Sequence, residues 1–436
     1  MPPGLLIAAP RSGAGKTTLS LGLMRAFRDR GIAIAGLKCG PDYIDPAFHE
    51  AATGRSGANL DSWAMDPGLL RNIAAEATAG ADLALCEGLM GLFDGVPGEP
   101  GRNGSSADIA AALGWPVLLT LDVSGQSQSA GAAALGCKLF DPRISIAGVV
   151  LNRVASARHE RLATEAIERT GIPVLGALPR STEIMLPERH LGLIQAGETE
   201  GLEEILERLA GFVAGNVDCD RILALAKAPE QSDAARHGGI RPPAQRIAIA
   251  RDAAFSFIYP HLLRAWSQSG AEIVFFSPLA DESPPEHCDL CWLPGGYPEL
   301  HAGKIATAGK FLSGVRTFAK TKPVHGECGG YMVLGQALID ASGTSHAMVN
   351  LLSHVTSFAQ RRMTLGYREA KLLRNGPLGD AGARYRGHEF HYSTITEAGF
   401  DEPFAEVTDL HGAAPARTGS VRGLTSGGFF HLIAPV

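Results

Sequence analysis

Long apolar runs are absent from this sequence. A membrane-spanning helix needs about 20 consecutive apolar residues, and no stretch of the chain approaches that length. The first apolar run, at residues 5–9, is followed at once by Pro10 and Arg11, and no basic segment precedes it. It therefore does not resemble the core of a secretory signal peptide. We expect a protein of the cytoplasm that neither spans a membrane nor is secreted.

Basic residues are not in excess either. Lysine and arginine number 39 against 45 aspartate and glutamate residues, which gives a formal net charge of −6 at pH 7. Proteins that bind nucleic acids usually present a basic face, so this balance does not suggest a nucleic acid as partner.

Cysteine is scarce, with seven residues in a chain of 436. So small and odd a number is not a disulfide framework, and reduced thiols are expected in a cytosolic protein. Cys288 and Cys291 form a Cys-x-x-Cys pair that leads into a predicted strand, where alternate faces would separate the thiols, so we expect a structural role. Four others are expected to be inert buried thiols: Cys39, Cys86, Cys137 and Cys219.

The composition is otherwise that of a globular protein, 45% hydrophobic and 19% charged, which argues against extended disorder and coiled coil. The length predicts two to four domains of about 100–200 residues each. In the first half, nearly continuous apolar runs alternate with helix-like segments, as in a parallel α/β sheet. We expect strands at 5–9, 33–37, 83–86, 117–121, 146–151 and 174–178, and helices at 16–28, 67–79, 107–113, 128–139 and 158–170.

The alternation stops where the chain becomes polar and rich in glycine and proline, which is typical of an interdomain linker. Apolar strand patterns then resume at 246–250, 273–276, 290–293 and 323–325. We therefore predict two doubly wound α/β domains, at residues 1–227 and 245–436, joined by a linker at 228–244.

A phosphate-binding loop follows the first predicted strand. The segment Ala-Pro-Arg-Ser-Gly-Ala-Gly-Lys-Thr-Thr at 9–18 nearly matches Gly-x-x-x-x-Gly-Lys-Ser/Thr, with Pro10 in place of the first glycine. Its glycines let backbone N–H groups point at phosphate oxygens, and the helix N-terminus adds positive charge. Lys16 can reach the β and γ phosphates, and the Thr17 hydroxyl can bind Mg²⁺. The predicted nucleotide site consists of Ser12, Gly13, Ala14, Gly15, Lys16, Thr17 and Thr18.

Charged residues follow two further predicted strands. Lys38 comes after the second strand, with Asp42 and Asp45 next to it in a Gly-Pro turn, and Glu87 and Asp94 follow the third. In a doubly wound sheet these loops converge on the phosphate loop. Mg²⁺ uses only one or two carboxylates, so four acids exceed its need. The surplus acids either position a substrate or cap turns.

A nucleophile motif occurs in the second predicted domain. The spacing Gly326-x-Cys328-x-Gly330 is that of a nucleophile on a tight turn between a strand and a helix. A helix N-terminus lowers the pKa of a thiol, and a histidine is needed as base. The candidates for that base are His325, His388, His391 and His431.

This Gly-Glu-Cys-Gly-Gly segment and the Pro-Gly-Gly at 294–296 together resemble class I glutamine amidotransferase domains. The resemblance implies that Cys328 forms a glutamyl thioester, that the Gly295 and Gly296 backbone N–H groups make the oxyanion hole, and that His431 is the base. In that family the pattern is His-x-Glu, but position 433 is isoleucine. Glu389 is the candidate for a displaced orienting acid.

The first half resembles dethiobiotin-synthetase-like ATPases. Three segments, at 38–46, 87–95 and 295–299, are similar to those of the a,c-diamide synthases that act on cobyrinic acid or on metal-free hydrogenobyrinic acid, and the resemblance covers essentially the whole chain. It implies an ATP-dependent amide ligase of cobalamin biosynthesis. One domain would phosphorylate the c and then the a carboxylate of a corrin ring, and ammonia from glutamine would displace the phosphate.

The resemblance also implies roles for single residues. It assigns Mg²⁺ to Thr17, Asp45 and Glu87, and the charge of the acyl phosphate to Lys38. It implies ATP and Mg²⁺ as cofactors and a corrin polycarboxylate and glutamine as further small-molecule partners, without nucleic acid or membrane. The adenine would be contacted by Asn152 and Pro179, and the residues expected to position or meet the substrate are Asp42, Tyr43, Asp94, Arg102, Asn103, Ser105 and Ser106.

Two other functions stay open on the sequence alone. One is a regulatory P-loop ATPase with a degenerate amidotransferase module, which Pro10 and the missing acid at 433 favour and Cys328 and His431 oppose. The other is a sister amide ligase for a different tetrapyrrole, such as nickel-sirohydrochlorin. Whether the ring carries cobalt, and whether the chain forms a homodimer, also stays open.

Overall fold

The structure is a computed structural model that describes residues 1–181, 188–189, 192–193, 195–229, 240–410, 412 and 414–436. The chain divides into two compact units, Met1–His237 and Gly238–Val436. Residues 230–239 of the predicted linker lie outside the described residues, so the linker at 228–244 stays a prediction. No helix of the described ranges is long and apolar enough to cross a membrane.

The first unit is built on a seven-stranded sheet in the order β3-β2-β4-β1-β5-β6-β7, and every neighbouring pair in it is parallel. The strands consist almost entirely of buried residues because helices cover both faces. After β1 the chain builds β2, β3 and β4 on one side, and it then crosses to β5 on the other side of β1. Such a change of direction opens a crevice at the carboxyl ends of the strands. The strands are β1 Gly4–Ala8, β2 Ile34–Cys39, β3 Ala58–Leu60, β4 Leu83–Glu87, β5 Val117–Asp122, β6 Ile146–Val154 and β7 Val174–Pro179.

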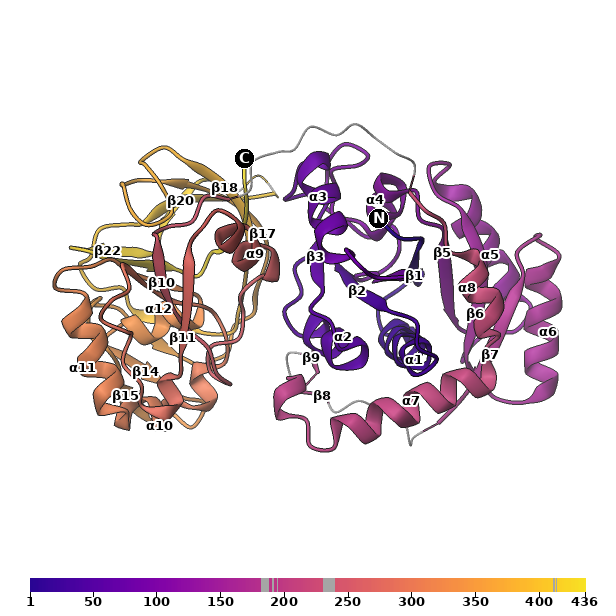
Figure 1. Ribbon diagram of the computed structural model, residues 1–436, viewed down its shortest axis with the longest axis horizontal. Coiled ribbons are helices and arrows are strands. Elements are labelled where there is room, and N and C mark those ends of the chain that lie inside the picture. Colours follow the sequence, from indigo (N-terminus) through magenta and orange to yellow (C-terminus); the bar gives the residue numbers. More distant parts are fainter. Residues whose placement is uncertain (182–187, 190–191, 194, 230–239, 411, 413) are drawn as a thin grey trace. The chain divides into compact units, whose positions relative to one another are not determined.

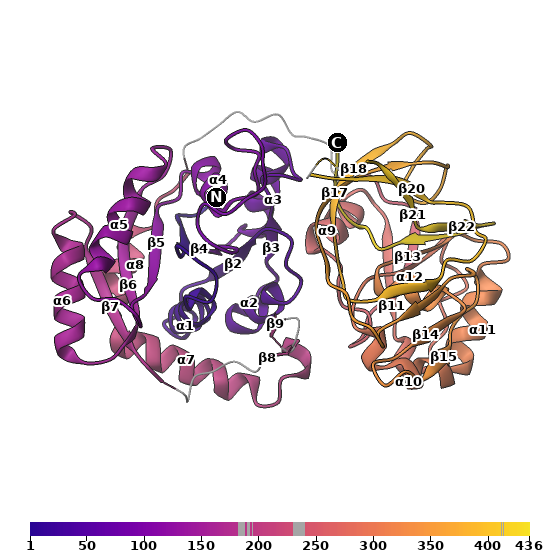
Figure 2. The same ribbon diagram turned by 180° about the vertical axis from the view of Figure 1, so that it is seen from behind.

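Helices cover both faces of this sheet. In Figure 1, α1, α2 and α7 lie together on one side of the sheet and α3 and α4 on the other, and the view from behind in Figure 2 shows the same grouping. Leu19, Leu23 and Leu209 are fully buried in the core between the sheet and the first group. The helices are α1 Lys16–Asp29, α2 Asp45–Thr53, α3 Pro67–Ala77, α4 Ser106–Leu113, α5 Ser129–Phe140, α6 Ala157–Glu168, α7 Leu202–Asn216 and α8 Cys219–Leu225, with the short strands β8 Glu188–Arg189 and β9 Gly192–Leu193 between α6 and α7.

The second unit contains a six-stranded sheet in the order β11-β10-β12-β13-β23-β22, parallel except for the edge strand β22. This is the mostly parallel sheet that the sequence predicts. Its strands are β10 Arg246–Ala250, β11 Glu272–Phe276, β12 Leu290–Leu293, β13 Val324–Glu327, β22 Ser420–Arg422 and β23 Thr425–Gly428, and its helices are α9 Pro260–Gln268, α10 Ala302–Thr307, α11 Gly309–Phe318 and α12 Gly329–Leu334.

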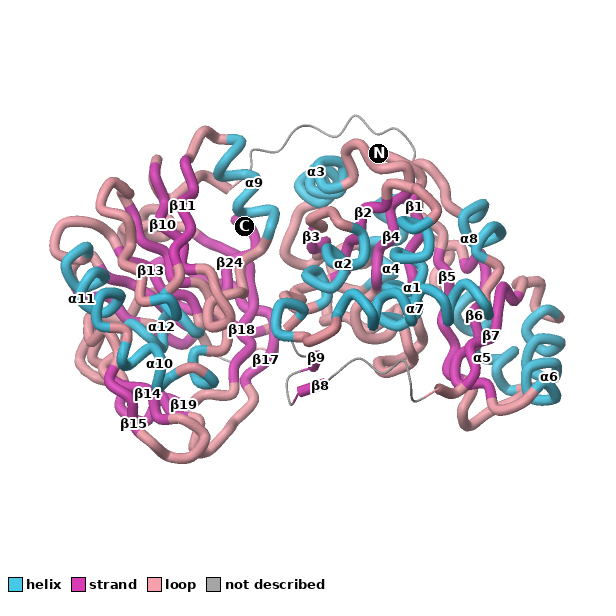
Figure 3. Tube along the Cα trace, turned by 60° about the horizontal axis from the view of Figure 1, so that its bottom comes forward, coloured by secondary structure: helices cyan, strands magenta, loops and turns pink. Residues whose placement is uncertain are grey.

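Two smaller sheets complete this unit. An antiparallel sheet of five strands has the order β21-β20-β17-β18-β24, and a sheet of four has the order β15-β14-β16-β19. Figure 3 shows β14, β15 and β19 together at one end of the unit. The strands are β14 Ala337–Ile339, β15 Ser345–Ala347, β16 Val355–Ser357, β17 Thr364–Leu372, β18 Arg384–His391, β19 Thr394–Glu397, β20 Ala405–Asp409, β21 Ala416–Thr418 and β24 His431–Pro435.

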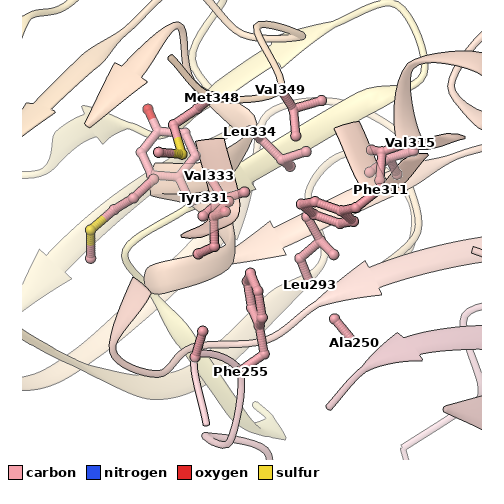
Figure 4. Packing of buried hydrophobic residues seen from close by; sticks show 14 of the residues in the cluster. Ala250, Phe255, Leu293, Phe311, Val315, Tyr331, Val333, Leu334, Met348 and Val349 are labelled. Carbon is pink, nitrogen blue, oxygen red and sulfur yellow. The ribbon is translucent and has the colours of Figure 1, made fainter. Parts of the chain in front are cut away.

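The core of the second unit surrounds α12. Tyr331, Val333 and Leu334 from this short helix pack among Phe255, Phe311 and other apolar side chains (Figure 4). All six residues of α12 are buried. A helix this short has little intrinsic stability, so its position is set by tertiary packing. That packing fixes the residue immediately before it, Cys328.

The predicted elements of both sheets are found, with ends that differ by up to three residues. Asp45 was expected in a turn, but it is the first residue of α2. The elements not predicted from the sequence include α2, β3, α7, α8, α9, α10, α11, β22, β23 and all strands of the two smaller sheets. Cys219 is half-buried rather than buried, whereas Cys39, Cys86, Cys137, Cys288 and Cys291 are buried as expected.

Candidate functional site

The loop between β1 and α1 has the backbone of a phosphate cradle. Gly13 and Gly15 adopt positive φ angles of 71° and 98°, which glycine tolerates, and Gly15 caps α1. A Cβ on Gly15 would lie 2.1 Å from the Asn152 amide nitrogen, which itself donates to the Ala14 carbonyl at 2.9 Å. The predicted adenine residue Asn152 therefore also braces the loop.

Lys16 lies at the start of α1 with 8% of its surface exposed. Its Nζ donates to the backbone carbonyl of Met90 at 2.6 Å. Burial and the charge of Lys38 lower the pKa of Lys16, which Glu87 and Asp45 oppose. Lys16 is thus bonded to the loop that follows β4, the loop in which Asp94 also lies.

The predicted metal ligands meet around Lys38. Parallel pairing of β2 and β4 places Lys38 opposite Glu87, and the two side chains are 3.0 Å apart at Nζ and Oε1. The same Glu87 oxygen accepts from the Thr17 hydroxyl at 2.7 Å, and Lys38 also bonds Asp45. Asp42 is 3.9 Å from the Lys38 nitrogen. The structure therefore brings together all of the residues predicted for metal and acyl-phosphate contacts.

Burial and neighbouring charges shift the pKa values of the groups in this cluster. Burial opposes the charge of Lys38, but Asp45 and Glu87 outweigh it and hold the Lys38 pKa well above its usual value. Glu87 is fully buried, yet Lys38 and a hydrogen bond from His49 keep its pKa below the ordinary range. Burial and the neighbouring charge of Asp42 raise the pKa of Asp45 to about 8. Asp45 therefore keeps its proton more readily than an ordinary carboxyl group, and a positive charge bound beside it would favour its ionised form.

His49 is a site residue that the sequence analysis missed. It is fully buried on α2, and its Nε2 lies 2.9 Å from Glu87 Oε2. Because Asp45 and His49 are four residues apart on one helix, they share a face and both reach the cluster. That spacing was visible in the sequence, but it carries meaning only once the helix is known.

The acids predicted to position substrate also hold their own loops. Asp42 Oδ1 accepts from the backbone N–H groups of Ile44 and Asp45 at 2.8 and 3.0 Å. Asp94 Oδ2 accepts from Gly91 N at 2.8 Å, and its residue is exposed. Capping, the alternative weighed for these acids, is therefore observed for both. It leaves the second oxygen of each carboxylate for another contact.

The loop that leads into α4 differs from the expectation at Ser105. Ser105 is 1% exposed, and its hydroxyl accepts from Asp108 N at 3.3 Å as the cap of α4, so contact with a substrate is not supported. Ser106 is likewise buried and bonds Leu89. Arg102, Asn103 and Tyr43 stay half-buried, and Arg102 donates to Trp63 O at 3.2 Å. The missed residue here is Asp108, which accepts from Gly101, Asn103 and Arg143.

A second feature missed in the sequence lies at the end of β5. Asp122 accepts from Arg153 at 2.6 Å and also bonds Arg11 of the phosphate loop. Burial disfavours the ionised form of Asp122, but hydrogen bonds from Ser124 and Arg153 outweigh it and lower the pKa of Asp122. Pro179, predicted to contact adenine, is exposed at the end of β7. Asp122 and Asn152 therefore both contact the phosphate loop, whereas Pro179 pairs with Val154 of β6.

In the second unit, Cys328 stands between β13 and α12 with φ 46° and ψ −103°, outside the conformations that a cysteine normally adopts. Its N–H donates to Gly428 O at 2.8 Å, which holds the strained turn against β23. The residue is 2% exposed. This is the tight strand-to-helix turn that the glycine spacing predicts.

Gly295 brings the nucleophile and the predicted base together. A Cβ on Gly295 would lie 2.4 Å from His431 Cε1 and 3.4 Å from Cys328 Cβ, so both residues flank the same glycine. A Cβ on Gly329 would lie 3.0 Å from Gly296 N, which places that backbone nitrogen beside the nucleophile turn. The predicted thiol, base and oxyanion groups therefore share one place.

Burial dominates the electrostatics of this second site. It raises the pKa of the Cys328 thiol, and the charge of Glu299 adds to the effect. Burial, followed by His388 and His391, holds the pKa of His431 well below its usual value. Cys328 is therefore a thiol and His431 a neutral imidazole at neutral pH, which is the state in which a histidine can accept a proton.

The other candidate bases have partners elsewhere. His325 Nδ1 lies 2.9 Å from the Ser426 hydroxyl, His388 Nε2 lies 2.8 Å from the Tyr259 hydroxyl, and His391 Nδ1 lies 3.0 Å from Ser393 O. The candidate acid Glu389 accepts from Arg368 Nε at 2.8 Å. Of the four histidines, His431 is the one that flanks Gly295 together with Cys328, and its role as base stays a prediction.

Comparisons with known proteins find two families of domains in this chain. A family model described as a CobQ/CobB/MinD/ParA nucleotide binding domain matches residues 5–194, and one described as a CobB/CobQ-like glutamine amidotransferase domain matches residues 246–435. A protein of Rhodobacter capsulatus called hydrogenobyrinate a,c-diamide synthase is 58% identical over 435 residues, 99% of this chain and 99% of its own. The chain belongs to the hydrogenobyrinate a,c-diamide synthase family.

Two further relatives of this family have the same name. The protein of Mesorhizobium japonicum is 55% identical and that of Agrobacterium fabrum 54% identical, each over 430 residues, 99% of this chain and 98% of theirs. Among solved structures, chloroplast FtsY from Physcomitrella patens covers 42% of this chain and 60% of its own at 19% identity and a TM-score of 0.31, too weak a likeness to support an inference.

Membership of the hydrogenobyrinate a,c-diamide synthase family confirms the predicted resemblance, fold class and enzyme class. The chain is an amide-forming ligase with a nucleotide-binding domain and a glutamine amidotransferase domain. A purely regulatory P-loop ATPase, left open by the sequence, is not supported. The roles of the single site residues stay predictions.

Proposed function

We propose that this chain converts hydrogenobyrinate, the metal-free corrin acid named in its relatives, to the a,c-diamide at the expense of ATP and glutamine, as a cytoplasmic step of cobalamin biosynthesis. The observation that carries the proposal is the near full-length identity to those relatives, at 54–58%. The convergence of Lys16, Lys38 and Glu87 in one unit and of Cys328 and His431 in the other supports it.

The first unit would activate the carboxylate. A carboxylate does not react with ammonia at neutral pH, so a phosphoryl group is transferred to it from ATP, and the resulting acyl phosphate has a leaving group. The phosphates lie on the loop amides before α1 and against Lys16. Lys38, held protonated by Asp45 and Glu87, can offset the charge where substrate carboxylate and phosphate meet.

Mg²⁺ fits the residues of this unit. Among the described residues no group of three or more His, Cys, Asp or Glu side chains could hold a metal alone, but Mg²⁺ needs only one or two carboxylates beside phosphate and water. Thr17, Asp45 and Glu87 supply oxygen atoms only, which suits a hard cation, and a bound cation would favour the ionised form of Asp45. When bound, Mg²⁺ neutralises charge on the transferring phosphate.

The second unit would release ammonia. The Cys328 sulfur attacks the glutamine side-chain amide, His431 accepts the thiol proton and then gives it to the departing ammonia, and water hydrolyses the thioester. The N–H groups near Gly295 and Gly296 would face the oxyanion. Cys328 is preorganised for this attack because its strained turn fixes the sulfur beside them.

A substrate panel tests the proposed function. The full chain is incubated with ATP, Mg²⁺, glutamine and one of three rings, hydrogenobyrinate, cobyrinate or nickel-sirohydrochlorin, and amides are counted by mass spectrometry. We expect two amidations of hydrogenobyrinate at the highest kcat/KM. Preferred amidation of nickel-sirohydrochlorin would overturn the proposed substrate but keep the chemistry.

Replacing His431 with alanine should slow glutamine-dependent amidation by about 100-fold, because general base catalysis contributes that much or more. Amidation with added ammonia should continue, since the change lies in the other unit from the ATP site. The measurement is glutamate release and diamide formation. His346→Ala, which removes a histidine bonded to Asp340 in the same unit, is the matched control. Full glutamine hydrolysis by His431→Ala would move the base to another histidine.

Asp42→Asn and Asp94→Asn should allow the first amidation and impair the second, so that monoamide accumulates. The amide oxygen keeps the backbone caps of both loops, while the charge beside Lys38 or toward the substrate is lost. The ring must rebind with a second carboxylate presented, and errors in positioning cost rate steeply. The measurement is a time course of monoamide and diamide.

The matched alanine variants separate positioning from capping. Loss of a cap costs about 1 kcal/mol, so Asp42→Ala and Asp94→Ala should also unfold at lower temperature, whereas the asparagine variants should not. If the asparagine variants give the wild-type ratio of monoamide to diamide, the two acids only cap their loops.

A further inference from the structure

The histidine base of the amidotransferase unit lacks the acid that its sequence pattern leads one to expect. Position 433 is isoleucine, whose carbonyl lies 2.9 Å from His261 Nε2. The structure instead places a different carboxylate beside the ring. Glu327 Oε2 lies 3.9 Å from His431 Nδ1, and both side chains are almost completely buried, with 4% and 0% exposed.

We propose that Glu327 is the positioning residue of His431 and replaces the acid that is absent at 433. This inference rests on the proposed function of Cys328 and His431 in glutamine hydrolysis. It concerns the residue immediately before the nucleophile, so one tight turn would supply both the thiol and the acid.

The chain holds Glu327 in place from both strands. Glu327 ends β13, next to Cys328, and its Oε1 accepts from Leu432 N of β24 at 3.2 Å. His431 is the first residue of β24. One carboxylate oxygen is therefore fixed by the backbone beside the histidine, and the other is directed to the ring.

This arrangement selects one ring nitrogen for catalysis. With Nδ1 toward the carboxylate, Nε2 is the nitrogen left to take the thiol proton. The His431 ring lies against Gly295, because a Cβ on that glycine would be 2.4 Å from His431 Cε1. As the sulfur–carbon bond forms, the proton passes from sulfur to Nε2, and it leaves with ammonia when the carbon–nitrogen bond breaks. Glu327 stabilises the imidazolium between these two events.

The neighbouring histidines oppose a positive charge on the His431 ring. His388 stacks on His431 with ring centres 5.0 Å apart, and it and His391 disfavour a charged His431. Glu389 accepts from Arg368, as described above. An anion beside the ring would offset the imidazolium charge that these two histidines oppose.

The predicted dependence on pH follows from the burial of Glu327, which raises its pKa to about 8. The ionised form supports the imidazolium, so glutamine hydrolysis should rise with pH through this range. The groups that face the pair are Cys328, His388 and His391, with Glu299 and Glu389 toward the thiol. A variant without the carboxylate should lack this rise.

The test uses the full chain and the variants Glu327→Gln and Glu327→Asp. Glutamine retains the oxygen that Leu432 N needs, so the unit should fold, which thermal unfolding and ammonia-dependent amidation check. We expect Glu327→Gln to lower kcat of glutamine hydrolysis about 100-fold at unchanged KM, since Glu327 does not touch glutamine. Glu327→Asp, still ionisable, should recover at least about tenfold of that loss.

One control variant and the outcomes of the Glu327 variants decide between this inference and its rivals. Glu369→Gln removes a carboxylate bonded to Arg384 in the adjacent five-stranded sheet and should hydrolyse glutamine normally. Hydrolysis within twofold of wild type by Glu327→Gln, or a loss that aspartate does not recover, would overturn the role of Glu327. If the wild-type chain hydrolyses no glutamine, the proposed function fails and not this inference alone.

Discussion

Cys328→Ser is expected to lower glutamine-dependent amidation by at least about a thousandfold, the scale on which loss of a nucleophile acts. The serine hydroxyl is a much weaker nucleophile than a thiol. His431 is also a weak base for it, because burial and two neighbouring histidines lower the pKa of His431. Amidation with added ammonia should continue close to the wild-type rate, since acyl phosphate formation uses residues of the other unit.

The measurement compares diamide formation from glutamine with formation from ammonium salt at the same pH. Serine and cysteine have the same shape, so the strained turn and the buried α12 that follows it should persist. Cys219→Ser, which changes a half-buried thiol in the first unit, is the control. If Cys328→Ser loses both activities while its thermal unfolding matches wild type, amidation is not divided between the units as proposed.

The sequence allowed the phosphate loop and the nucleophile turn to be predicted because each is a local structure. Glycines at 13, 15, 326 and 330 permit backbone angles or close approaches that other residues forbid. Their spacing can be recognised in the sequence without knowing which segments pack against them. The apolar runs of the central strands were equally clear, because those strands are buried on both faces. These features need no knowledge of tertiary contacts.

Other features depend on contacts between distant segments and could not be predicted. His49 becomes a site residue only because α2 brings it to Glu87, 38 residues away. Ser105 looked like a substrate residue, but α4 begins immediately after it and uses its hydroxyl as a cap. The antiparallel strands of the second unit are half-exposed and mixed in polarity, so their pattern resembled that of loops.

The missing acid at 433 illustrates the same limit. Glu389 was the candidate acid from the sequence because it follows His388, but its side chain accepts a hydrogen bond from Arg368. Glu327 was overlooked because its neighbour Cys328 had the obvious role. Only the approach of β24 to the end of β13 reveals that the carboxylate of Glu327 lies beside His431.

Lys16→Ala is expected to lower amidation from both nitrogen sources by about 100- to 1000-fold, the loss typical of removing one charged or donor group that faces a transition state. Lys16 is the cation that the phosphate-loop pattern fixes at the start of α1. Lys38 cannot take over, because Asp45 and Glu87 already bind its ammonium group and a move toward the phosphates would take that cation away from two buried acids.

The expected loss also has a second cause in the fold. Lys16 donates to the Met90 carbonyl, and Met90 has the unusual φ of 50°. This hydrogen bond couples the phosphate loop to the loop that carries Asp94. Alanine at 16 would break the coupling as well as the charge contact, so it should weaken the response of that loop to ATP.

The measurements are ATP binding by calorimetry and amidation with glutamine and with ammonia. Lys138→Ala, which removes an exposed lysine bonded to Thr170 O, is the control and should match wild type. Lys16→Ala should hydrolyse glutamine at the Cys328 site, which distinguishes loss of carboxylate activation from unfolding. Ammonia-dependent turnover close to wild type would mean that phosphoryl transfer does not depend on this loop, and the surplus acids around Lys38 would then need a different explanation.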